Sequence, residues 1–379
     1  MRVETIDTLP KTMRAIRCHG PQDYRLEEVA VPTPAPGEVV IKLDACGICA
    51  SDIKCYLGAP LFWGDENRKG YIQAPVTAGH ELIGTVVALG EGAGARYGLT
   101  LGDRAISEQI VPCNACRYCL TGKYWLCAVH DIYGFHTYTQ GGMADYMLFP
   151  ARALNYKVPA DLPIEKAALI EPLACSMHAV ERALIEFGDV AVIAGAGTLG
   201  LGMVSCARLK NPGLLVVVDL NDARLELARS LGADITLNPM KVDVVEEIRN
   251  LTEGYGCDVY IEATGHPEAV NQGLHAIRKG GNFVEFSVMK EPTTSDWTII
   301  GDTKELNIYG AHLGPGCYPK VIDYLHRGLL KVDGIVTHQI PLEKYEEGIQ
   351  MVAGGQNSIK VLLRPDMHTG DLPSEFGTL

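Results

Sequence analysis

Four cysteines within residues 113–127 constrain this chain more than any other feature of its sequence. They are Cys113, Cys116, Cys119 and Cys127, spaced C-x2-C-x2-C-x7-C. Four thiolates complete the tetrahedral shell of a zinc ion and leave no open coordination position. Disulfides or free thiols are the alternative, but the remaining cysteines are scattered through an ordinary intracellular composition, which favours metal. The sequence therefore predicts a structural zinc site in this loop.

The length and the net charge of the chain limit the classes of protein to which it can belong. A chain of 379 residues is expected to form about two domains, because single cores stop growing beyond roughly 250–300 residues. The net charge of −13 argues against a nucleic-acid partner, since phosphate binding needs clustered Lys and Arg. We find no apolar run long enough to span a membrane and no signal-peptide pattern at the start. We therefore expect no membrane partner and a cytoplasmic location.

The pattern of apolar residues changes near residue 170. Before it, short apolar runs at 38–43, 83–89 and 145–149 are interrupted by Gly, Pro and Asp, which is typical of a β-rich domain. After it, predicted strands alternate with amphipathic helices. The strands are expected at 190–194, 214–219, 258–263 and 282–287, and the helices at 222–231 and 267–277. This alternation predicts an α/β domain with a doubly wound parallel sheet.

The last part of the chain has no glycine fingerprint, and we assign its predicted strand at 360–363 to the first domain. The expected β-rich domain therefore comprises residues 1–170 and 312–379. The expected α/β domain comprises residues 171–311.

A glycine-rich motif follows the predicted strand at 190–194 and opens a helical run. Its residues are Gly195, Ala196, Gly197, Thr198, Leu199 and Gly200. Glycines at these positions let the backbone turn tightly and approach a pyrophosphate, which rests on the helix N-terminus. A plain structural turn is the alternative, but the strand and helix on either side favour a dinucleotide site.

Asp219 ends the next predicted strand, nineteen residues after Gly200. A carboxylate there can accept hydrogen bonds from ribose hydroxyls and would repel a 2′-phosphate, which favours NAD over NADP. Arg224, a helical turn farther on, keeps NADP open as the alternative. We assign both residues to the cofactor site.

Neither the cysteine motif nor the glycine-rich motif indicates a reaction, so the catalytic residues must lie elsewhere in the sequence. The stretches GICASD and GHE supply a thiolate, an imidazole and a carboxylate from the β-rich domain, at Cys49, His80 and Glu81. Taken singly, Cys49 is more often a small buried apolar residue and His80 a core or surface histidine.

Five motifs together change this interpretation: GICASD, AGHE, PCNACRYCLTGKYWLC, EPLAC and GAGTLG, in this order along the chain. The combination resembles the zinc-dependent medium-chain dehydrogenases. Within them it resembles the polyol branch typified by sorbitol dehydrogenase, because residues 170–173 (IEPL) stand where alcohol dehydrogenases place a third cysteine ligand. The stretches 54–67, 256–266 and 310–315 add a narrower similarity to bacterial dehydrogenases of four-carbon sugar alcohols, the erythritol and threitol type.

This resemblance implies a GroES-like catalytic domain, a Rossmann cofactor domain and two zinc ions per chain. Cys49 and His80 would bind the catalytic zinc. Glu81 would bind it directly or after movement of the metal, and Glu171 directly or through water. The remaining implied site residues are Ser51, contacting the substrate oxygen; Asp52, orienting a ligand such as His80; and Thr264, at the cofactor. Lys54 replaces a relay histidine of several relatives, which leaves the outward proton route open.

The implied reaction is NAD-linked oxidation of a secondary hydroxyl of a short sugar alcohol to a ketose. The resemblance also implies a homo-oligomer, either a dimer or a tetramer. A threonine or simple alcohol dehydrogenase of the same superfamily is one alternative. A non-catalytic NAD-binding zinc protein is another.

Overall fold

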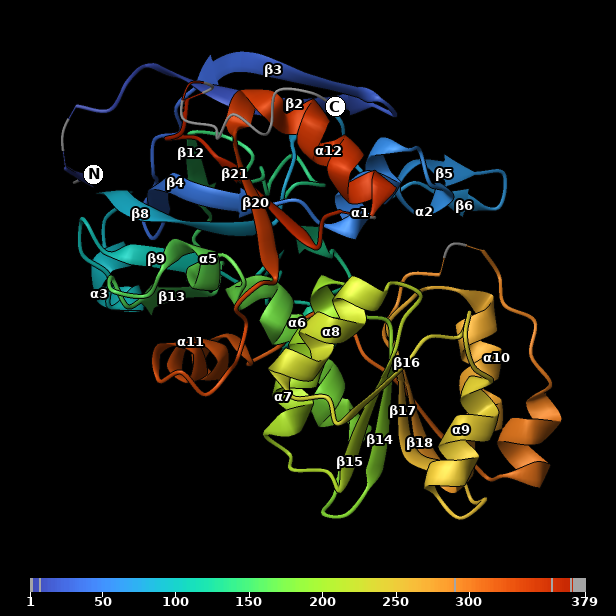
Figure 1. Cartoon of the computed structure of the whole chain (residues 1–379). Helices are drawn as coiled ribbons and strands as arrows, with labels where there is room; N and C mark the ends of the chain where they lie inside the picture. Colours follow the sequence, from blue (N-terminus) through green and yellow to red (C-terminus); the bar gives the residue numbers. More distant parts are fainter. Residues whose placement is uncertain (1–2, 7, 290, 356, 369, 371–379) are drawn as a thin grey trace. The chain divides into compact units, whose positions relative to one another are not determined.

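The computed structural model describes residues 3–6, 8–289, 291–355, 357–368 and 370. They divide into two compact units, Met1–Glu171 with Val336–Leu379, and Pro172–Ile335. The first unit consists mainly of β-strands, and the second alternates strands with helices (Figure 1). The predicted fold class is thus confirmed. None of the described helices is long and apolar enough to cross a bilayer.

The main sheet of the first unit has eight strands among the described residues. Its principal path is β13 (Asn155–Val158), β9 (Arg104–Ser107), β8 (Glu81–Leu89), β4 (Val39–Gly47), β21 (Lys360–Arg364) and β20 (Val336–Pro341). In addition, β1 (Glu4–Thr5) pairs with β8 and β12 (Tyr146–Phe149) pairs with β4. The pairing of β21 with β4 confirms that the predicted strand at 360–363 returns to this unit.

Smaller elements complete the first unit. The described residues form three short sheets: β2 (Thr12–Gly20), β3 (Asp23–Ala30) and β7 (Val76–Thr77); β5 (Gly64–Asp65) and β6 (Arg68–Lys69); and β10 (Ile110–Val111) and β11 (Asp131–Ile132). The helices are α1 (Ala50–Tyr56), α2 (Pro60–Trp63), α3 (Ala93–Tyr97), α4 (Arg117–Leu120), α5 (Ile164–Ala167) and α12 (Tyr345–Gly354), with 3-10 turns at Tyr124–Leu126 and Leu342–Lys344.

Alternation along β4 explains how the main sheet is anchored. Val39, Ile41 and Leu43 are buried in one apolar cluster, whereas Lys42 between them is exposed. Successive side chains of a strand point to opposite faces, so this spacing directs one face of β4 to the core. Toward its end β4 is buried throughout, at the point where it leads into the residues of the candidate site.

The second unit contains a six-stranded sheet among its described residues, and every pairing in it is parallel. The order is β16 (Ile235–Leu237), β15 (Leu214–Val218), β14 (Val190–Ala194), β17 (Cys257–Glu262), β18 (Ile277–Glu285) and β19 (Asn307–Gly310). The helices are α6 (Ile170–Ala183), which begins at the end of the first unit, α7 (Thr198–Arg208), α8 (Asp222–Leu231), α9 (Val244–Leu251), α10 (Pro267–Ala276) and α11 (Tyr318–His326), with a π-helical turn at Ile299–Thr303.

Helices lie on both faces of this sheet, with α6 and α7 on one side and α9 and α10 on the other (Figure 1). The central strands are therefore buried on both faces, which explains their continuous apolar sequences. The strand order reverses at β14, which is flanked by β15 and β17. In open parallel sheets, ligands bind beyond the carboxyl ends of the strands at such a reversal.

One domain boundary differs from the prediction, because residues 312–335 belong to the second unit. Gly314 packs so closely on α6 that a Cβ at this position would lie 2.4 Å from the Ala174 carbonyl carbon. Lys320 of α11 forms an ion pair with Glu181 of α6 at 2.7 Å. These contacts hold the segment on the second unit. The apolar pattern of the segment does not specify which unit it covers.

Candidate active site and metal centres

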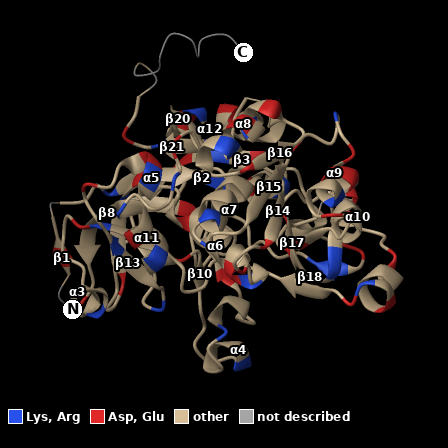
Figure 2. Ribbon diagram, turned by 60° about the horizontal axis from the view of Figure 1, so that its bottom comes forward, with Lys and Arg blue, Asp and Glu red and all other residues tan. Residues whose placement is uncertain are grey.

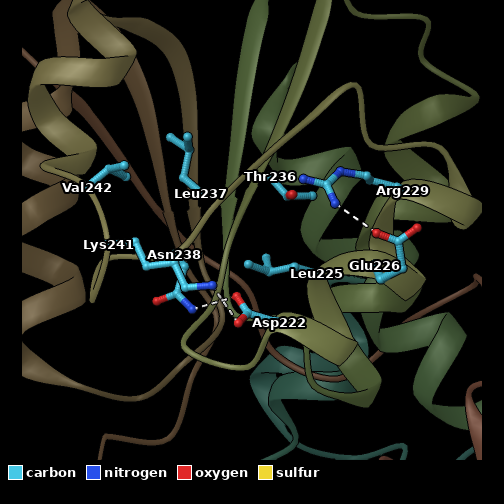
Figure 3. A pocket seen from close by; sticks show the side chains of 9 residues that line it. All are labelled: Asp222, Leu225, Glu226, Arg229, Thr236, Leu237, Asn238, Lys241 and Val242. Atoms are coloured by element: carbon cyan, nitrogen blue, oxygen red, sulfur yellow. Dashed lines mark hydrogen bonds and ion pairs between the residues drawn. The ribbon is translucent and has the colours of Figure 1, made fainter.

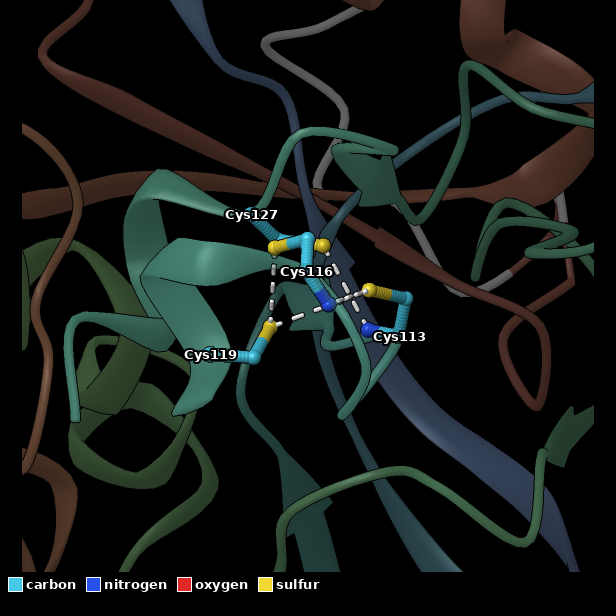
Figure 4. A group of neighbouring side chains, drawn as sticks. All are labelled: Cys113, Cys116, Cys119 and Cys127. Carbon is cyan, nitrogen blue, oxygen red and sulfur yellow. Dashed lines mark hydrogen bonds between the residues drawn. The ribbon is translucent and has the colours of Figure 1, made fainter. Parts of the chain in front are cut away.

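The four clustered cysteines meet in the loop that carries α4 (Figure 4). Their sulfur atoms lie within 4.8 Å of one another, with 3.6 Å between Cys116 and Cys119 and 3.9 Å between Cys113 and Cys119. Tetrahedral zinc with Zn–S bonds of about 2.3 Å would hold its sulfurs about 3.8 Å apart. None of the cysteines forms a disulfide. The separations therefore fit a shared metal ion.

Backbone N–H groups point at these sulfurs. Cys116 donates to the Cys113 sulfur at 3.3 Å, Cys113 donates to the Cys127 sulfur at 3.3 Å, and Ala128 donates to the Cys116 sulfur at 3.4 Å. The N–H groups of Ala128 and Cys119 lower the pKa of Cys116 to about 6. Such hydrogen bonds favour the thiolate form, which is the form that binds metal.

A second group of ligand atoms comes from Cys49, His80 and Glu81, again within 4.8 Å of one another. Cys49 precedes α1, His80 precedes β8, and Glu81 is the first residue of β8. The antiparallel pairing of β4 and β8 sets Gly47 opposite Glu81 and so brings the two stretches together. A thiolate, an imidazole and a carboxylate form a donor set that suits zinc. Cys49 is partly exposed, whereas His80 and Glu81 are buried.

Asp52 and Ser51 approach opposite nitrogens of the His80 ring. One carboxylate oxygen of Asp52 accepts the Cys49 N–H at 2.9 Å, and the other lies 3.5 Å from His80 Nδ1. The Ser51 hydroxyl lies 3.3 Å from His80 Nε2. Burial acts to lower the pKa of His80, but Asp52 and Cys49 outweigh it and raise this pKa well above its ordinary value. Asp52 therefore contacts two of the predicted zinc ligands, Cys49 and His80.

Glu171, the fourth predicted ligand, is not part of the group of described residues within 4.8 Å. It is buried near the start of α6, where its Oε1 atom accepts a hydrogen bond from Gln109 Nε2 at 2.5 Å. Gln109 lies between β9 and β10 and was not identified from the sequence.

Lys360 is a second buried residue of this centre that the sequence analysis missed. Its Nζ atom donates to both carboxylate oxygens of Glu81, at 2.7 and 2.5 Å, and to the Ile48 carbonyl at 3.0 Å. Both side chains of the pair are only 2% exposed. Burial acts to lower the pKa of Lys360, but Glu81 and Cys49 outweigh it and raise this pKa. In the sequence, a lysine at the start of an otherwise apolar predicted strand, KVLL, could have indicated this buried residue.

The glycine motif forms the turn between β14 and α7. Gly195 has φ +103°, and a Cβ there would lie 2.7 Å from the Ala263 carbonyl oxygen and 3.2 Å from Cγ2 of Thr264. A Cβ on Gly200 would lie 1.8 Å from the Gly195 carbonyl oxygen. A Cβ on Gly197, in contrast, would meet no described atom within 4 Å. Two glycines thus permit close packing and the middle one leaves open space, as a pyrophosphate-binding turn requires.

Asp219 connects this turn to the start of α8. Its carboxylate accepts the N–H of Ala196 at 2.6 Å and the N–H of Asn221 at 2.8 Å. Arg224 lies in the first turn of α8. Thr264 follows β17, and its backbone N–H and hydroxyl both donate to the buried Glu262 carboxylate. The predicted cofactor residues are therefore brought to the carboxyl ends of β14, β15 and β17.

A cavity of about 430 Å³ lies elsewhere in the second unit (Figure 3). It is lined by Asp222, Leu225, Glu226, Arg229, Thr236, Leu237, Asn238, Lys241 and Val242. Its charged side chains pair with one another: Asp222 with Lys241 at 2.7 Å and Glu226 with Arg229 at 2.8 Å. It contains none of the predicted cofactor residues.

Two family matches cover most of the chain. Residues 35–160 match the alcohol dehydrogenase GroES-like domain, and residues 198–327 match the zinc-binding dehydrogenase domain. The chain belongs to the zinc-dependent medium-chain dehydrogenases. It is therefore an oxidoreductase of the alcohol and polyol dehydrogenase type, and the resemblance drawn from the five motifs is confirmed.

Individual relatives span nearly the whole molecule. The chain is 51% identical to an erythritol/L-threitol dehydrogenase of Mycolicibacterium smegmatis, over 94% of this chain and 99% of the relative. It is 33% identical to an L-threonine 3-dehydrogenase of Symbiobacterium thermophilum, over 95% and 99% of the two chains. The crystal structure of 2R,3R-butanediol dehydrogenase from Bacillus subtilis superposes with a TM-score of 0.82, at 32% identity over 93% of this chain and 100% of the other.

Proposed function

We propose that this medium-chain dehydrogenase oxidises a secondary hydroxyl of a four-carbon sugar alcohol of the erythritol or threitol type to a ketose, with NAD as hydride acceptor. The observation that carries the substrate class is the 51% identity to an erythritol/L-threitol dehydrogenase along almost the full length of both chains. The buried Glu171, in place of a third cysteine, supports a polyol rather than a simple alcohol as substrate.

We also propose two zinc ions per chain, one held by the four clustered cysteines and one by Cys49 and His80 with a carboxylate. When bound there, the catalytic zinc would supply the Lewis-acid chemistry that makes a substrate hydroxyl more acidic. The Ser51 hydroxyl, beside His80, would accept a hydrogen bond from the substrate hydroxyl and be the first group of the path by which its proton leaves. Asp52 accepts a hydrogen bond from the backbone N–H of Cys49 and also faces His80. These two contacts fix the orientation of both ligands.

The β-rich unit would hold the catalytic metal, and the α/β unit would bind NAD through the glycine turn, Asp219 and Thr264. We further propose a homo-oligomer and a cytoplasmic location. Size-exclusion chromatography with light scattering tests the oligomer.

A panel of four-, five- and six-carbon polyols, assayed with NAD and with NADP, tests the reaction. We expect erythritol or threitol to give a kcat/KM at least about tenfold above that of ethanol and of L-threonine, which corresponds to about 1.4 kcal/mol of transition-state discrimination. L-Threonine belongs in the panel because a relative at 33% identity is an L-threonine 3-dehydrogenase. Strong turnover of ethanol or threonine with none of any polyol would refute the proposed substrate class.

Replacing Asp219 by serine tests the choice of cofactor. We expect weaker NAD binding and a smaller preference for NAD over NADP, because the carboxylate that would bind the ribose hydroxyls and repel a 2′-phosphate is lost. Dissociation constants for both cofactors, measured by fluorescence titration, provide the readout. The matched control is Asp222→Ser, since Asp222 pairs with Lys241 at the surface. Unchanged affinity for both cofactors in Asp219→Ser would contradict the assignment.

A further inference from the structure

Two buried carboxylates lie at the candidate catalytic centre, and each accepts hydrogen bonds from a buried side chain. Glu81 receives two hydrogen bonds from the Lys360 ammonium group, and Glu171 receives one from the side-chain amide of Gln109. An amide N–H donor fixes the direction of the carboxylate that it binds. The Gln109 amide therefore holds the Glu171 carboxylate in one orientation.

The backbone around Gln109 is fixed as well. Its carbonyl oxygen accepts the Tyr133 N–H at 3.0 Å, and the N–H of the preceding residue, Glu108, donates to the Leu154 carbonyl at 2.9 Å. The Glu108 carboxylate accepts hydrogen bonds from the hydroxyl groups of Tyr124, at 2.9 Å, and Tyr156, at 2.8 Å. Gln109 itself is only 2% exposed. The amide is thus placed by the body of the first unit before it contacts Glu171.

We propose that Gln109 is a positioning residue for the catalytic metal centre: its amide orients the Glu171 carboxylate toward that centre. This inference rests on the proposed function, in which Cys49 and His80 hold the catalytic zinc. Groups that orient a metal-binding side chain typically change metal affinity by about 10- to 100-fold when they are removed.

Gln109→Leu and Gln109→Asn test the proposal. Leucine removes the amide at similar volume, and asparagine keeps the amide on a side chain one methylene shorter. We expect both variants to release the metal of the catalytic site to a chelator about tenfold or more faster than the unmodified enzyme. We also expect the visible absorption of the cobalt-substituted enzyme to shift, because the ligand field changes. The matched control is Gln140→Leu, which removes another side-chain amide of the same unit, one that binds Arg17 and the Thr77 backbone.

A double-mutant cycle separates positioning from a general structural effect. In a Glu171→Gln background, Gln109→Leu should add less than a twofold change in release rate, because the two changes remove the same interaction. The proposal is overturned if Gln109→Leu has the same effect with and without Glu171. It is also overturned if neither release rate nor cobalt spectrum changes in the single variants, or if Gln140→Leu reproduces the full effect.

The metal readouts do not involve a polyol, so they distinguish this inference from the proposed function. An enzyme that oxidises no polyol, but whose cobalt spectrum responds to Gln109→Leu, would refute the substrate and support the positioning role. An enzyme that oxidises erythritol or threitol, but whose metal release rate and cobalt spectrum do not change in Gln109→Leu, would support the proposed function and refute the inference.

Discussion

Replacing Lys360 by methionine is expected to lower the free energy of unfolding by about 3–5 kcal/mol, the effect of breaking a buried ion pair by removing one partner. Methionine has a similar length but no charge, so the buried Glu81 carboxylate would lose the cation that contacts both its oxygens. Because the pKa of Lys360 is raised in the folded protein, this stabilisation is fully present at neutral pH. It would be lost only as the pH rises through that raised value.

Urea unfolding followed by circular dichroism measures the effect. The double variant Lys360→Met with Glu81→Gln should recover much of the loss, since it removes the unpaired charge as well. Lys344→Met is the matched control, because Lys344 pairs with the more exposed Glu347, and such a pair contributes roughly 0–1 kcal/mol. A loss below about 1 kcal/mol in Lys360→Met would show that the pair has little influence on stability.

Replacing Cys49 by alanine is expected to lower kcat/KM by at least about a thousandfold, because the metal centre supplies several kcal/mol of transition-state stabilisation. Metal analysis should fall from about two zinc ions per chain to about one, with the four clustered cysteines still loaded. NAD binding should persist, since the glycine turn belongs to the other unit. Elemental analysis, steady-state kinetics and NAD titration on the same preparation provide the three readouts.

Cys46→Ala is the control for this prediction. Cys46 is a fully buried cysteine three residues earlier, at the end of β4, and it is not part of the metal-binding group. Burial raises its pKa, so it is held as a neutral thiol. This variant should retain two zinc ions and most of its activity. Full activity of the unmodified enzyme with only one zinc ion per chain would contradict the assignment of one of the two clusters.

Local features of this protein were readable from the sequence. The strand at Val190–Ala194 and the helix at Asp222–Leu231 have the predicted bounds, because a doubly buried strand and an amphipathic helix leave clear patterns in neighbouring residues. The glycine turn was predictable for the same reason: the positive φ at Gly195 and the close contact of Gly200 with Gly195 arise within six residues.

Contacts between distant parts of the chain were not readable in this way. Residues 312–335 pack on α6, although their pattern allows either unit. Lys360 meets Glu81 across 279 positions, and Gln109 meets Glu171 across 62. Such pairs leave no periodic signal, since each partner has ordinary neighbours in its own segment.

The sequence by itself determined the cysteine loop, the glycine turn and the family, because the residues that form each motif are close together and their spacing carries the chemistry. The tertiary structure decided how the two carboxylates of the candidate catalytic centre are held. The pairing of β21 with β4 brings Lys360 to Glu81, and the fixed backbone between β9 and β10 brings Gln109 to Glu171. Each of these contacts joins segments that are distant in the sequence, so the partners come together only when the chain folds.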